Sequence, residues 1–570
     1  MTAASSIITP LLSDDVVKFA VDYKNRPVYR STSGRWRSAL LIIGAEISER
    51  IAYCGISLNL ITYLTGDLGQ STAAAAANVN AWFGFSLITP LLGAIIADSY
   101  LGRYRTIVVA SFIYVLGLGL LTISAVIPFN PTDCDSNSLS CHPPLFQLIL
   151  FFSSLYLVAL AQGGHKPCAQ AFGADQFDAE DLDECKAKSS FFNWWYFGSC
   201  TGTLVALTIL SYIQDNFGWG LGFGIPCITM SLALVVYLLG TMSYRFSISS
   251  DEKSPFMRIG RVFVIAVRNR SLVSSAPSLN DKAREILADQ GSQKFNFLDK
   301  ALLSPDSSKE DENSCSISEV EEAKSVLRLA PIWASCLVYG IVFAQSITLF
   351  TKQGVTMNRS IGSQFQIPPA ALQAVIYLAV LLFIPVYDRG LVPIARVLTR
   401  KPAGITMLQR IGVGLLFSVF SMLSAALVEI KRLQTAQDYG LVDTPDASIP
   451  MSIWWLVPQY VLLGLADVFA IIGLQEFFYD QVPAELRSVG LSLYLSIFGV
   501  GSFLSSFLIS VIQNASSKNG RDGWFADNLN RAHLDYFYWL LCGLSAMALL
   551  MYLFIARSYV YVRTSILIHA

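Results

Sequence analysis

The chain has 570 residues, of which 53% are hydrophobic and only 14% are charged, and its mean hydropathy is +0.50. Since a soluble domain is about 25% charged, this composition excludes an ordinary soluble protein. The 40 basic and 41 acidic residues nearly cancel, and the four histidines form no Cys/His cluster with metal-ligand spacing. We therefore expect neither a nucleic-acid partner nor a bound metal or organic cofactor.

Residues 1–37 are a polar N-terminal segment. They carry charges of both signs but no early apolar core or cleavage site, so we expect no signal peptide. Beyond this segment, apolar runs of about 20 residues, each long enough to cross a bilayer, recur along the chain. They predict an all-α membrane protein with twelve transmembrane helices. The first six lie near 38–65, 77–98, 105–128, 145–172, 191–213 and 219–242, and the second six near 325–350, 369–388, 405–430, 452–479, 488–513 and 533–556.

The twelve runs form two six-helix halves, 38–242 and 325–556, followed by a C-terminal tail, 557–570. The segment between them, 243–324, is hydrophilic and Ser-rich, and we expect a partly disordered linker. Lys and Arg concentrate in alternate loops, so the positive-inside rule places both termini and the linker in the cytoplasm. This outline is typical of a two-halved secondary transporter that handles its solute near the midplane.

Three ionisable residues, Glu46, Glu49 and Arg50, interrupt the first apolar run. Their spacings of three and four positions place them on one face of a helix. Charge at membrane depth is costly, so the cluster indicates a functional site. If Arg50 neutralises one carboxylate, the other remains an uncompensated acid that can load and release a proton. We predict a proton-coupling site here, with the proton gradient as the driving force.

The short loop after the second run contains Asp98, Arg103 and Arg105. Asp98 can pair with a basic residue and latch neighbouring helices in one state of a rocking cycle, so we expect a gating role for this loop. Thr106 follows Arg103 by three positions, a spacing that basophilic kinases read but that also occurs often by chance. Thr106 is therefore a candidate phosphorylation site.

Most of the ten cysteines fall within apolar helices, where packing is their expected role. Cys134 and Cys141 differ because they share the polar loop 130–144, which the alternation of loops places on the non-cytoplasmic side. We expect either a local disulfide between Cys134 and Cys141 or two free thiols.

The fourth run contains the sequence Gly163-Gly164-His165-Lys166-Pro167. The glycines allow close backbone approach and Pro167 removes a backbone donor, so we expect Lys166 where the helix breaks and a cavity opens. The alternative is a lysine that snorkels to the interface. At the start of the fifth run, Asn193 is the polar group that is able to face a substrate.

The tenth run places two acids, Asp467 and Glu476, on one apolar helix. They are nine positions apart and therefore face different directions. Lys166 in one half and Glu476 in the other are natural partners across a central cavity, in a pair that forms in one conformation and breaks in another. The alternative places Glu476 at the cytoplasmic end of the helix, near Asp480.

Together these motifs resemble the plant nitrate/peptide transporters, a branch of the proton-dependent oligopeptide transporters within the major facilitator superfamily. The likeness covers about residues 25–560, and its N-terminal part is most similar to the fifth plant subfamily. It is carried by Glu46–Arg50, Asp98–Thr106, Gly163–Pro167, Phe191–Gly198 and Glu476–Pro483. The resemblance implies the major facilitator fold, proton coupling by Glu46, Glu49 and Arg50, and alternating access supported by the Lys166 and Glu476 pair. It also aligns Thr106 with a threonine whose phosphorylation tunes one nitrate-transporting member.

Two departures from the family pattern bear on the substrate. Phe343 stands where the family's nitrate-binding histidine would be, so that mode of nitrate binding cannot operate here. Ile51 and Cys54 replace aromatic residues that are frequent in peptide-transporting relatives, which weakens a peptide interpretation slightly.

We expect a proton-coupled symporter of a small anionic or zwitterionic solute, and not an enzyme. Nitrate is the leading substrate on resemblance alone, followed by di- and tripeptides, plant hormones and specialised metabolites. An uncoupled passive exporter or channel is the second alternative. The expected partners are the solute, protons and the lipid bilayer of the plasma or vacuolar membrane, and the oligomeric state is left open.

Overall fold

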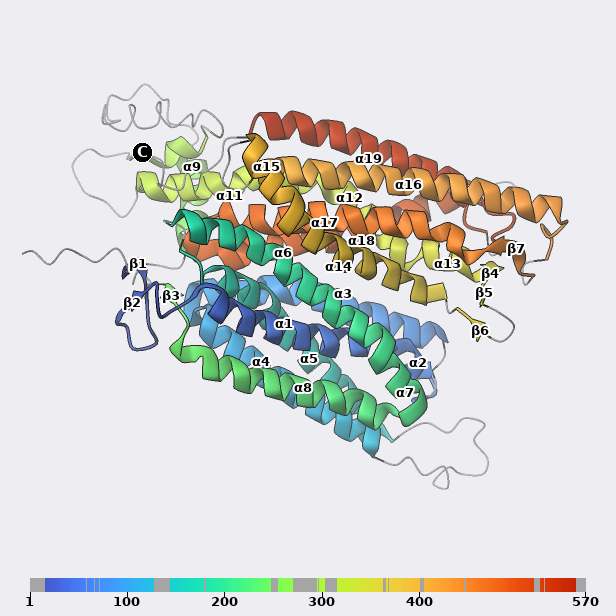
Figure 1. Ribbon diagram of the computed structural model, residues 1–570, viewed down its shortest axis with the longest axis horizontal. Helices are drawn as coiled ribbons and strands as arrows, with labels where there is room; N and C mark the ends of the chain where they lie inside the picture. Colours follow the sequence, from blue (N-terminus) through green and yellow to red (C-terminus); the bar gives the residue numbers. More distant parts are fainter. Residues whose placement is uncertain are drawn as a thin grey trace, which may run out of the picture.

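The structure is a computed structural model in which the long helices run side by side in two bundles, one blue to green and one yellow to red in Figure 1. It describes residues 16–57, 59–65, 67–70, 72–127, 144–178, 181–247, 255–269, 295, 297–302, 315–361, 365–367, 369–399, 404–444, 447–516, 523–526 and 528–559. Cys134 and Cys141 lie outside the described residues.

The N-terminal half contains six long helical segments, some of them continued by a short helix. They are α1 (Arg35–Ser57) with α2 (Leu60–Thr65), α3 (Thr72–Ile96) with η1 (Ala97–Leu101), α4 (Arg103–Val126), α5 (Leu145–Ala174), α6 (Leu182–Val205) with η3 (Ala206–Leu210) and α7 (Ser211–Phe217), and α8 (Trp219–Leu239) with η4 (Gly240–Met242).

The C-terminal half repeats this organisation after a linker that contains α9 (Pro255–Arg268) and η6 (Leu298–Leu302). Its segments are α11 (Ile317–Ser335) with α12 (Leu337–Ile347) and α13 (Leu349–Val355), η7 (Pro369–Gln373) with α14 (Ala374–Val386), η8 (Tyr387–Leu391) and α15 (Val392–Thr399), α16 (Met407–Asp438), η9 (Ile453–Leu456) with α17 (Val457–Asp480), η10 (Ala484–Leu486) with α18 (Arg487–Ser516), and α19 (Leu534–Arg557). The helix predicted to start near residue 325 therefore starts earlier, because a capping box at Ser316 and Glu319 satisfies its first amides.

Short strands mark the two ends of the bundles. At one end β1 (Val16–Val21) pairs with β2 (Pro27–Tyr29) and with β3 (Phe246–Ser247), all antiparallel. At the other end lie β4 (Met357–Asn358), β5 (Ser360–Ile361), β6 (Phe365–Gln366) and β7 (Ile449–Ser452). We call the end with β1–β3, α9 and the start of α11 the linker face, and the end with β4–β7 the opposite face (Figure 1).

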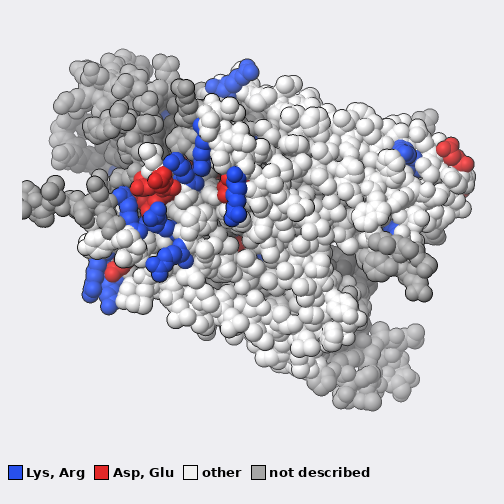
Figure 2. All heavy atoms as spheres, viewed as in Figure 1, with Lys and Arg blue, Asp and Glu red and all other residues white. Residues whose placement is uncertain are grey.

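The described chain contains ten helices that are long and apolar enough to cross a membrane, and eleven when the pair α11 and α12–α13, bent by 47°, is counted as one span. The twelfth is α1, which is long enough but carries Glu46, Glu49 and Arg50. Figure 2 shows that charged side chains gather over the linker face, while the middle of the visible surface is almost free of them. The predicted all-α membrane protein is confirmed.

Helices α3 and α5 touch through their backbones. A Cβ on Gly93 would lie 2.3 Å from the carbonyl oxygen of Gly163, and a Cβ on Gly163 would lie 2.6 Å from the carbonyl carbon of Thr89. The C-terminal half has an equivalent contact between α12 and α18, where a Cβ on Gly340 would lie 2.5 Å from the oxygen of Ile497. Since lipid gives helices no hydrophobic reason to associate, such close contacts let dispersion hold each half together.

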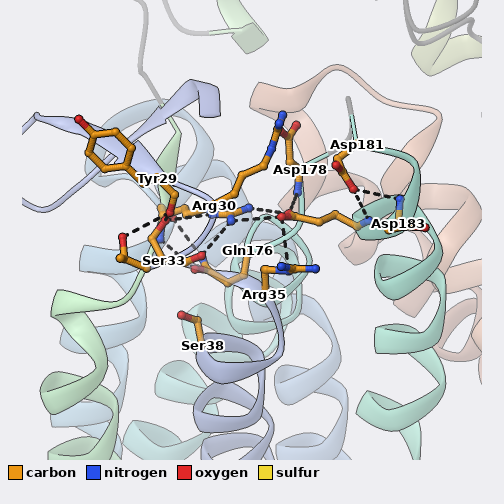
Figure 3. A network of polar contacts seen from close by, with 12 residues as sticks. Tyr29, Arg30, Ser33, Arg35, Ser38, Gln176, Asp178, Asp181 and Asp183 are labelled. Carbon is orange, nitrogen blue, oxygen red and sulfur yellow. Dashed lines mark hydrogen bonds and ion pairs between the residues drawn. The ribbon is translucent and has the colours of Figure 1, made fainter. Parts of the chain in front are cut away.

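A polar network, shown in Figure 3, ties the linker face of the N-terminal half together. At its centre is Arg245, which is buried and lies after α8; its Nη1 is 2.6 Å from Oε2 of Glu184, and its Nη2 donates to the Ser33 carbonyl at 2.8 Å. Gln176 exchanges two hydrogen bonds with the backbone of Arg245, at 2.9 and 3.1 Å. Arg30 pairs with Asp178 at 2.6 Å. We call this network the linker-face plate.

The linker-face plate fixes where α6 begins. The side chain of Asp181 accepts hydrogen bonds from the amides of Asp183 and Glu184, at 3.0 and 2.9 Å, and so caps the helix. Because Glu184 also holds Arg245, the start of α6 is connected to the end of α5 and to the chain that leaves α8. Side chains on the next turns of α6 are therefore presented from a rigid base.

The glycine contact between α3 and α5 predicts that alanine substitutions at two glycines of this helix pair change the stability of the protein differently. Gly163→Ala should lower the free energy of unfolding by about 1–3 kcal/mol, because the new methyl group overlaps the backbone of α3. Gly84→Ala, in the same helix pair but with nothing within 4 Å of the added Cβ, should be neutral or stabilising by up to about 1 kcal/mol. Thermal unfolding of the two variants in detergent measures this difference, and equal melting temperatures would contradict it.

Candidate functional site

The cluster in α1 is buried and internally paired. Glu46, Glu49 and Arg50 are only 1%, 0% and 8% exposed. Nε of Arg50 lies 2.6 Å from Oε2 of Glu49 and 3.3 Å from Oε1 of Glu46. The three side chains therefore lie together, as the spacing predicted, and the guanidinium of Arg50 contacts both carboxylates.

Neighbouring helices complete the surroundings of the two carboxylates. Ser199 of α6 donates to Oε1 of Glu46 at 2.8 Å, and Tyr114 of α4 donates to Oε1 of Glu49 at 3.3 Å. Within the described residues, Oε2 of Glu46 is buried without a hydrogen-bond partner. An unsatisfied carboxylate oxygen is costly in a protein interior, and protonation removes that cost. Of the two acids, Glu46 is the one with a free place for a proton.

Lys166 lies on α5, and the helix continues through Pro167 to Ala174. The predicted break at Pro167 is therefore wrong, because the proline is accommodated inside an otherwise regular helix. Lys166 is half-buried and close enough to Glu46, Glu49 and Arg50 to interact with them electrostatically. It forms no ion pair within the described residues.

The C-terminal half presents an acid of its own, Asp467 of α17. It is buried and accepts hydrogen bonds from the hydroxyl of Tyr339 on α12 and, at 3.5 Å, from that of Tyr196 on α6. The second of these bonds joins the two halves. The ring of Tyr339 belongs to an aromatic cluster centred on Phe498. The ring centroid of Phe498 lies 5.1 Å from that of Phe343 and 5.8 Å from that of Tyr494.

Glu476 lies elsewhere. It is nine positions after Asp467 on α17, about 13 Å further along the helix axis, towards the linker face. In this conformation its Oε2 is 3.8 Å from Nη1 of Arg410, so Glu476 pairs with α16 of its own half and not with Lys166. The position near Asp480, which was the alternative, is the one observed, because α17 ends only four residues later.

A first group of contacts closes the linker face between the halves. Arg103 lies 3.2 Å from Asp98 and also pairs with Asp175 at the end of α5. Both acids reach across to α18: Asp98 accepts from the Val489 amide at 3.1 Å, and Asp175 pairs with Arg487 at 2.7 Å. Arg103 itself donates to Ser488 at 3.0 Å and to the carbonyl of Ala484, and Tyr479 donates to Asp175.

A second group does the same from the other half, with Asp388 of η8 in the place of Asp98. The two oxygens of Asp388 accept from three side chains of α6, namely Asn193 at 2.6 Å, Ser190 at 2.7 Å and Trp194 at 3.1 Å. Arg410 donates to the Asn193 oxygen at 2.6 Å. Asn193 therefore lies in a contact between the halves, which differs from the predicted substrate-facing position.

Lys188 of α6 adds an ion pair with Asp480 of α17 at 2.7 Å. We call the two groups and this pair together the linker-face latch, whose charged members are Asp98, Arg103, Asp175, Lys188, Asp388, Arg410, Asp480 and Arg487. Because the latch joins helices of both halves, the linker face is closed in this conformation.

Two residues of the predicted gating loop take no part in the latch. Arg105 is exposed and forms no hydrogen bond or ion pair within the described residues. Thr106 is 5% exposed and donates to the Gly102 carbonyl at 2.9 Å. A kinase could reach its hydroxyl only in another conformation.

The charge state of Asp175 follows from its surroundings. Burial alone would raise its pKa, but Arg103, Arg487 and the Tyr479 hydroxyl outweigh burial and hold the pKa below the ordinary value of 3.8. A carboxyl group with a lowered pKa stabilises the state that contains it at every pH above the ordinary value, and loses this effect as the pH falls through the lowered value. Asp175 itself therefore stays ionised, and keeps its pairs with Arg103 and Arg487, throughout the physiological range.

Most of the latch was not predicted. The sequence indicated Asp98 and Arg103 through their loop, but Asp175, Lys188, Asp388 and Arg410 were passed over. A signal existed for Asp388. An aspartate, an arginine and a glycine stand together at the end of the eighth run, and the same three residue types occur in the loop at Asp98. For Asp175 and Lys188, neither spacing nor hydropathy distinguishes them from other charges at helix ends.

Comparison with known proteins identifies the family. The model of the POT family matches residues 104–525, about three quarters of the chain. The chain belongs to the POT family. Protein NRT1/ PTR FAMILY 5.10 of Arabidopsis thaliana is 64% identical over 553 residues, which is 97% of each chain, and Protein NRT1/ PTR FAMILY 5.14 of the same plant is 53% identical over 99% of each.

Solved structures agree in fold. A crystal structure of an auto inhibited POT family peptide transporter superposes with a TM-score of 0.61 at 24% identity, covering 93% of this chain and 98% of that one. A POT family transporter in complex with 5-aminolevulinic acid gives 0.56 at 17% identity, with coverage of 93% and 98%. The protein is thus a multi-pass membrane transporter of the POT family and not an enzyme, as the motifs predicted.

The latch predicts that Asp175→Asn opens the linker face. The substitution leaves Arg103 and Arg487 without their shared carboxylate, at a cost of about 2 kcal/mol, so the ratio of closed to open molecules should fall about thirtyfold. The measurement is the yield of zero-length carbodiimide cross-links between Lys188 and Asp480, which form only when the two residues touch. The adjacent pair Lys186 and Asp183, 2.8 Å apart within α6, provides the internal reference.

The same cross-link tests the lowered pKa of Asp175. Normalised to the internal reference, the wild-type yield should stay constant between about pH 5 and 7.5, because Asp175 remains ionised throughout. Asp443→Asn, which removes an exposed carboxylate on the opposite face, should behave as wild type. A yield that falls steadily with acidification would refute the lowered pKa.

Proposed function

We propose that this POT family member is a proton-coupled symporter of a small anionic or zwitterionic solute, with nitrate as the leading candidate, working by alternating access. The observation that carries the proposal is the buried cluster in α1, in which two carboxylates share Arg50 and one oxygen of Glu46 has no partner. Such a group binds a proton when a nearby charge changes, which is what coupling requires.

Charge balance supplies the coupling. With Glu46 and Glu49 ionised and Arg50 and Lys166 protonated, the four side chains sum to zero. An anion that binds beside Arg50 and Lys166 makes the site negative, and a proton on Glu46 restores neutrality. Because unbalanced charge is expensive away from water, anion and proton favour each other's binding. Moving one proton through about 100 mV yields about 2.3 kcal/mol to drive accumulation.

Asp467 favours a zwitterion as the second candidate. Its carboxylate lies on the C-terminal half, while the basic groups Arg50 and Lys166 lie on the N-terminal half, so the two halves offer groups of opposite charge. A di- or tripeptide, or a plant hormone or specialised metabolite with both an amino and a carboxyl group, would match groups on both halves. Phe343, with no hydrogen-bonding atom, sets its ring beside Phe498 and would contact an apolar body better than it would nitrate.

The closed latch supports one direction for the cycle. With the linker face as the cytoplasmic side, as the positive-inside rule predicts, the closed latch describes a carrier that loads from the opposite side and releases to the cytoplasm once the latch opens. The opposite side would be the cell exterior for a plasma-membrane protein or the lumen for a vacuolar one, and both are more acidic than the cytoplasm in plants. The alternative is an uncoupled exporter or channel, in which the α1 carboxylates would be dispensable.

The proposal predicts what happens when one carboxylate of the cluster is replaced by an amide. In reconstituted vesicles, Glu49→Gln and Glu46→Gln should each abolish uptake driven by a pH gradient, while exchange of labelled for unlabelled solute should persist because exchange needs no net proton movement. Asp183→Asn, an exposed carboxylate on α6, should keep wild-type uptake. The solutes to be compared are nitrate, dipeptides and plant hormones, and gradient-driven uptake by Glu49→Gln at the wild-type rate would disprove the coupling.

A further inference from the structure

The helical segment α14–η8–α15 exposes apolar side chains along its length. Its exposed apolar residues continue past the end of α14 into α15, where Val397 and Leu398 are both 79% exposed. The full set of exposed large apolar residues is Leu378, Leu382, Val386, Leu391, Ile394, Val397 and Leu398. Apolar side chains on both sides of η8 place this turn at the boundary between the acyl chains and the headgroups of the linker-face leaflet.

Two arginines lie within this apolar surface. Arg389 is exposed, and its guanidinium carbon lies 5.4 Å from the ring centroid of Trp194, which belongs to α6 of the other half. Arg396 follows seven positions later, about two turns, and is half-buried with an Nε that has no hydrogen-bond partner. In the described part of the chain, neither guanidinium forms an ion pair.

Two carboxylates of this region have other partners. Both oxygens of Asp388 accept hydrogen bonds from Ser190, Asn193 and Trp194. Glu476 pairs with Arg410. Within the described residues, neither Arg389 nor Arg396 is in ion-pair contact with a carboxylate, although a charge at this depth is stabilised by such a contact.

We propose that Arg389 and Arg396 bind the phosphate of an anionic phospholipid at the seam between α6 and η8. The planar guanidinium of arginine matches phosphate oxygens in a bidentate fork, which a phosphodiester headgroup offers at the depth of Arg389. The acyl chains would lie along Leu382 and Val386. A soluble phosphate offers similar anionic oxygens but cannot gain from this apolar surface, so the lipid is the expected ligand.

The site is complete only when the linker face is closed. Arg389 comes from the C-terminal half, whereas Trp194, on which it rests, comes from the N-terminal half and also donates to Asp388. A ligand that binds one conformation better shifts the population towards it. Anionic lipid should therefore favour the closed linker face and slow release to that side.

The test compares the intact protein in nanodiscs of phosphatidylcholine alone with nanodiscs in which about a third of the lipid is phosphatidylglycerol. Native mass spectrometry should detect retained phosphatidylglycerol on the wild type, and Arg389→Gln or Arg396→Gln should each weaken this retention about fivefold, as expected for about 1 kcal/mol per arginine. The matched control is Arg105→Gln, which removes an exposed arginine from the linker face of the N-terminal half and should retain the lipid as wild type does. Equal loss in all three variants would show general attraction and overturn the site.

The conformational effect is read from the cross-link between Lys188 and Asp480. Phosphatidylglycerol should raise its yield in the wild type and leave it unchanged in Arg389→Gln, while the two proteins should match in phosphatidylcholine alone, because the latch bonds of Asp388 come from α6. A lower yield for Arg389→Gln in both lipids would place its effect within the latch and refute the lipid role. Soluble glycerol phosphate, added to phosphatidylcholine nanodiscs, should have no effect, and an equal rise would identify an aqueous anion as the ligand instead.

Discussion

The free energy of taking an ion out of water is the constraint on which this structure depends. A buried charge costs several kcal/mol unless a partner and hydrogen bonds compensate it, and a protein in lipid has no water at mid-depth to help. The chain meets this cost in two ways. Some pairs lie within one half, such as Glu429 and Arg432 at 2.6 Å, both 0% exposed. Others join the halves and would have to break in the proposed alternating-access cycle.

The two kinds of pair differ in depth. The pairs that join the halves lie at the linker face, where water can reach them: the side chain of Asp480 is 16% exposed and that of Arg487 is 21% exposed. Separating them therefore leaves ions that can be hydrated at once. The fully buried pair Arg245 and Glu184 stays within the N-terminal half and holds α6 in place. Ion pairs within one half can be buried away from water, whereas ion pairs that would separate need to lie where water can hydrate the two ions.

Much of the fold could be predicted, because it follows from local pattern. Run length and hydropathy identify the helices, and the spacing of Glu46, Glu49 and Arg50 identifies one helical face whatever surrounds it. The predictions that failed concern partners distant in sequence. Asn193 and Asp388 are 195 positions apart, and only the rotation and tilt of two helices decide that they meet. Glu476 was paired with Lys166 on charge alone, although depth along α17 sets its partner.

The helix at Pro167 shows a second limit. Loss of one backbone hydrogen bond predicts a break, yet neighbouring helices in a membrane protein hold a proline-containing helix straight enough to continue. A proline in the sequence predicts the loss of one backbone hydrogen bond. Packing against the neighbouring helices decides whether the helix kinks at that point. The close contact of Gly163 with α3 fixes α5 within a turn of that proline.

The strands at the linker face also have a consequence for biosynthesis. Strand β1 can pair with β2 early, but its pairing with β3 becomes possible only after residues 246–247 have been made. At a synthesis rate of about 5–20 residues per second, the N-terminal segment waits for roughly 10–45 s. The N-terminal half can then close on itself before most of the C-terminal half exists. Synthesis thus allows the transporter to be assembled as two parts in sequence, the same two parts that would move against each other in the proposed cycle.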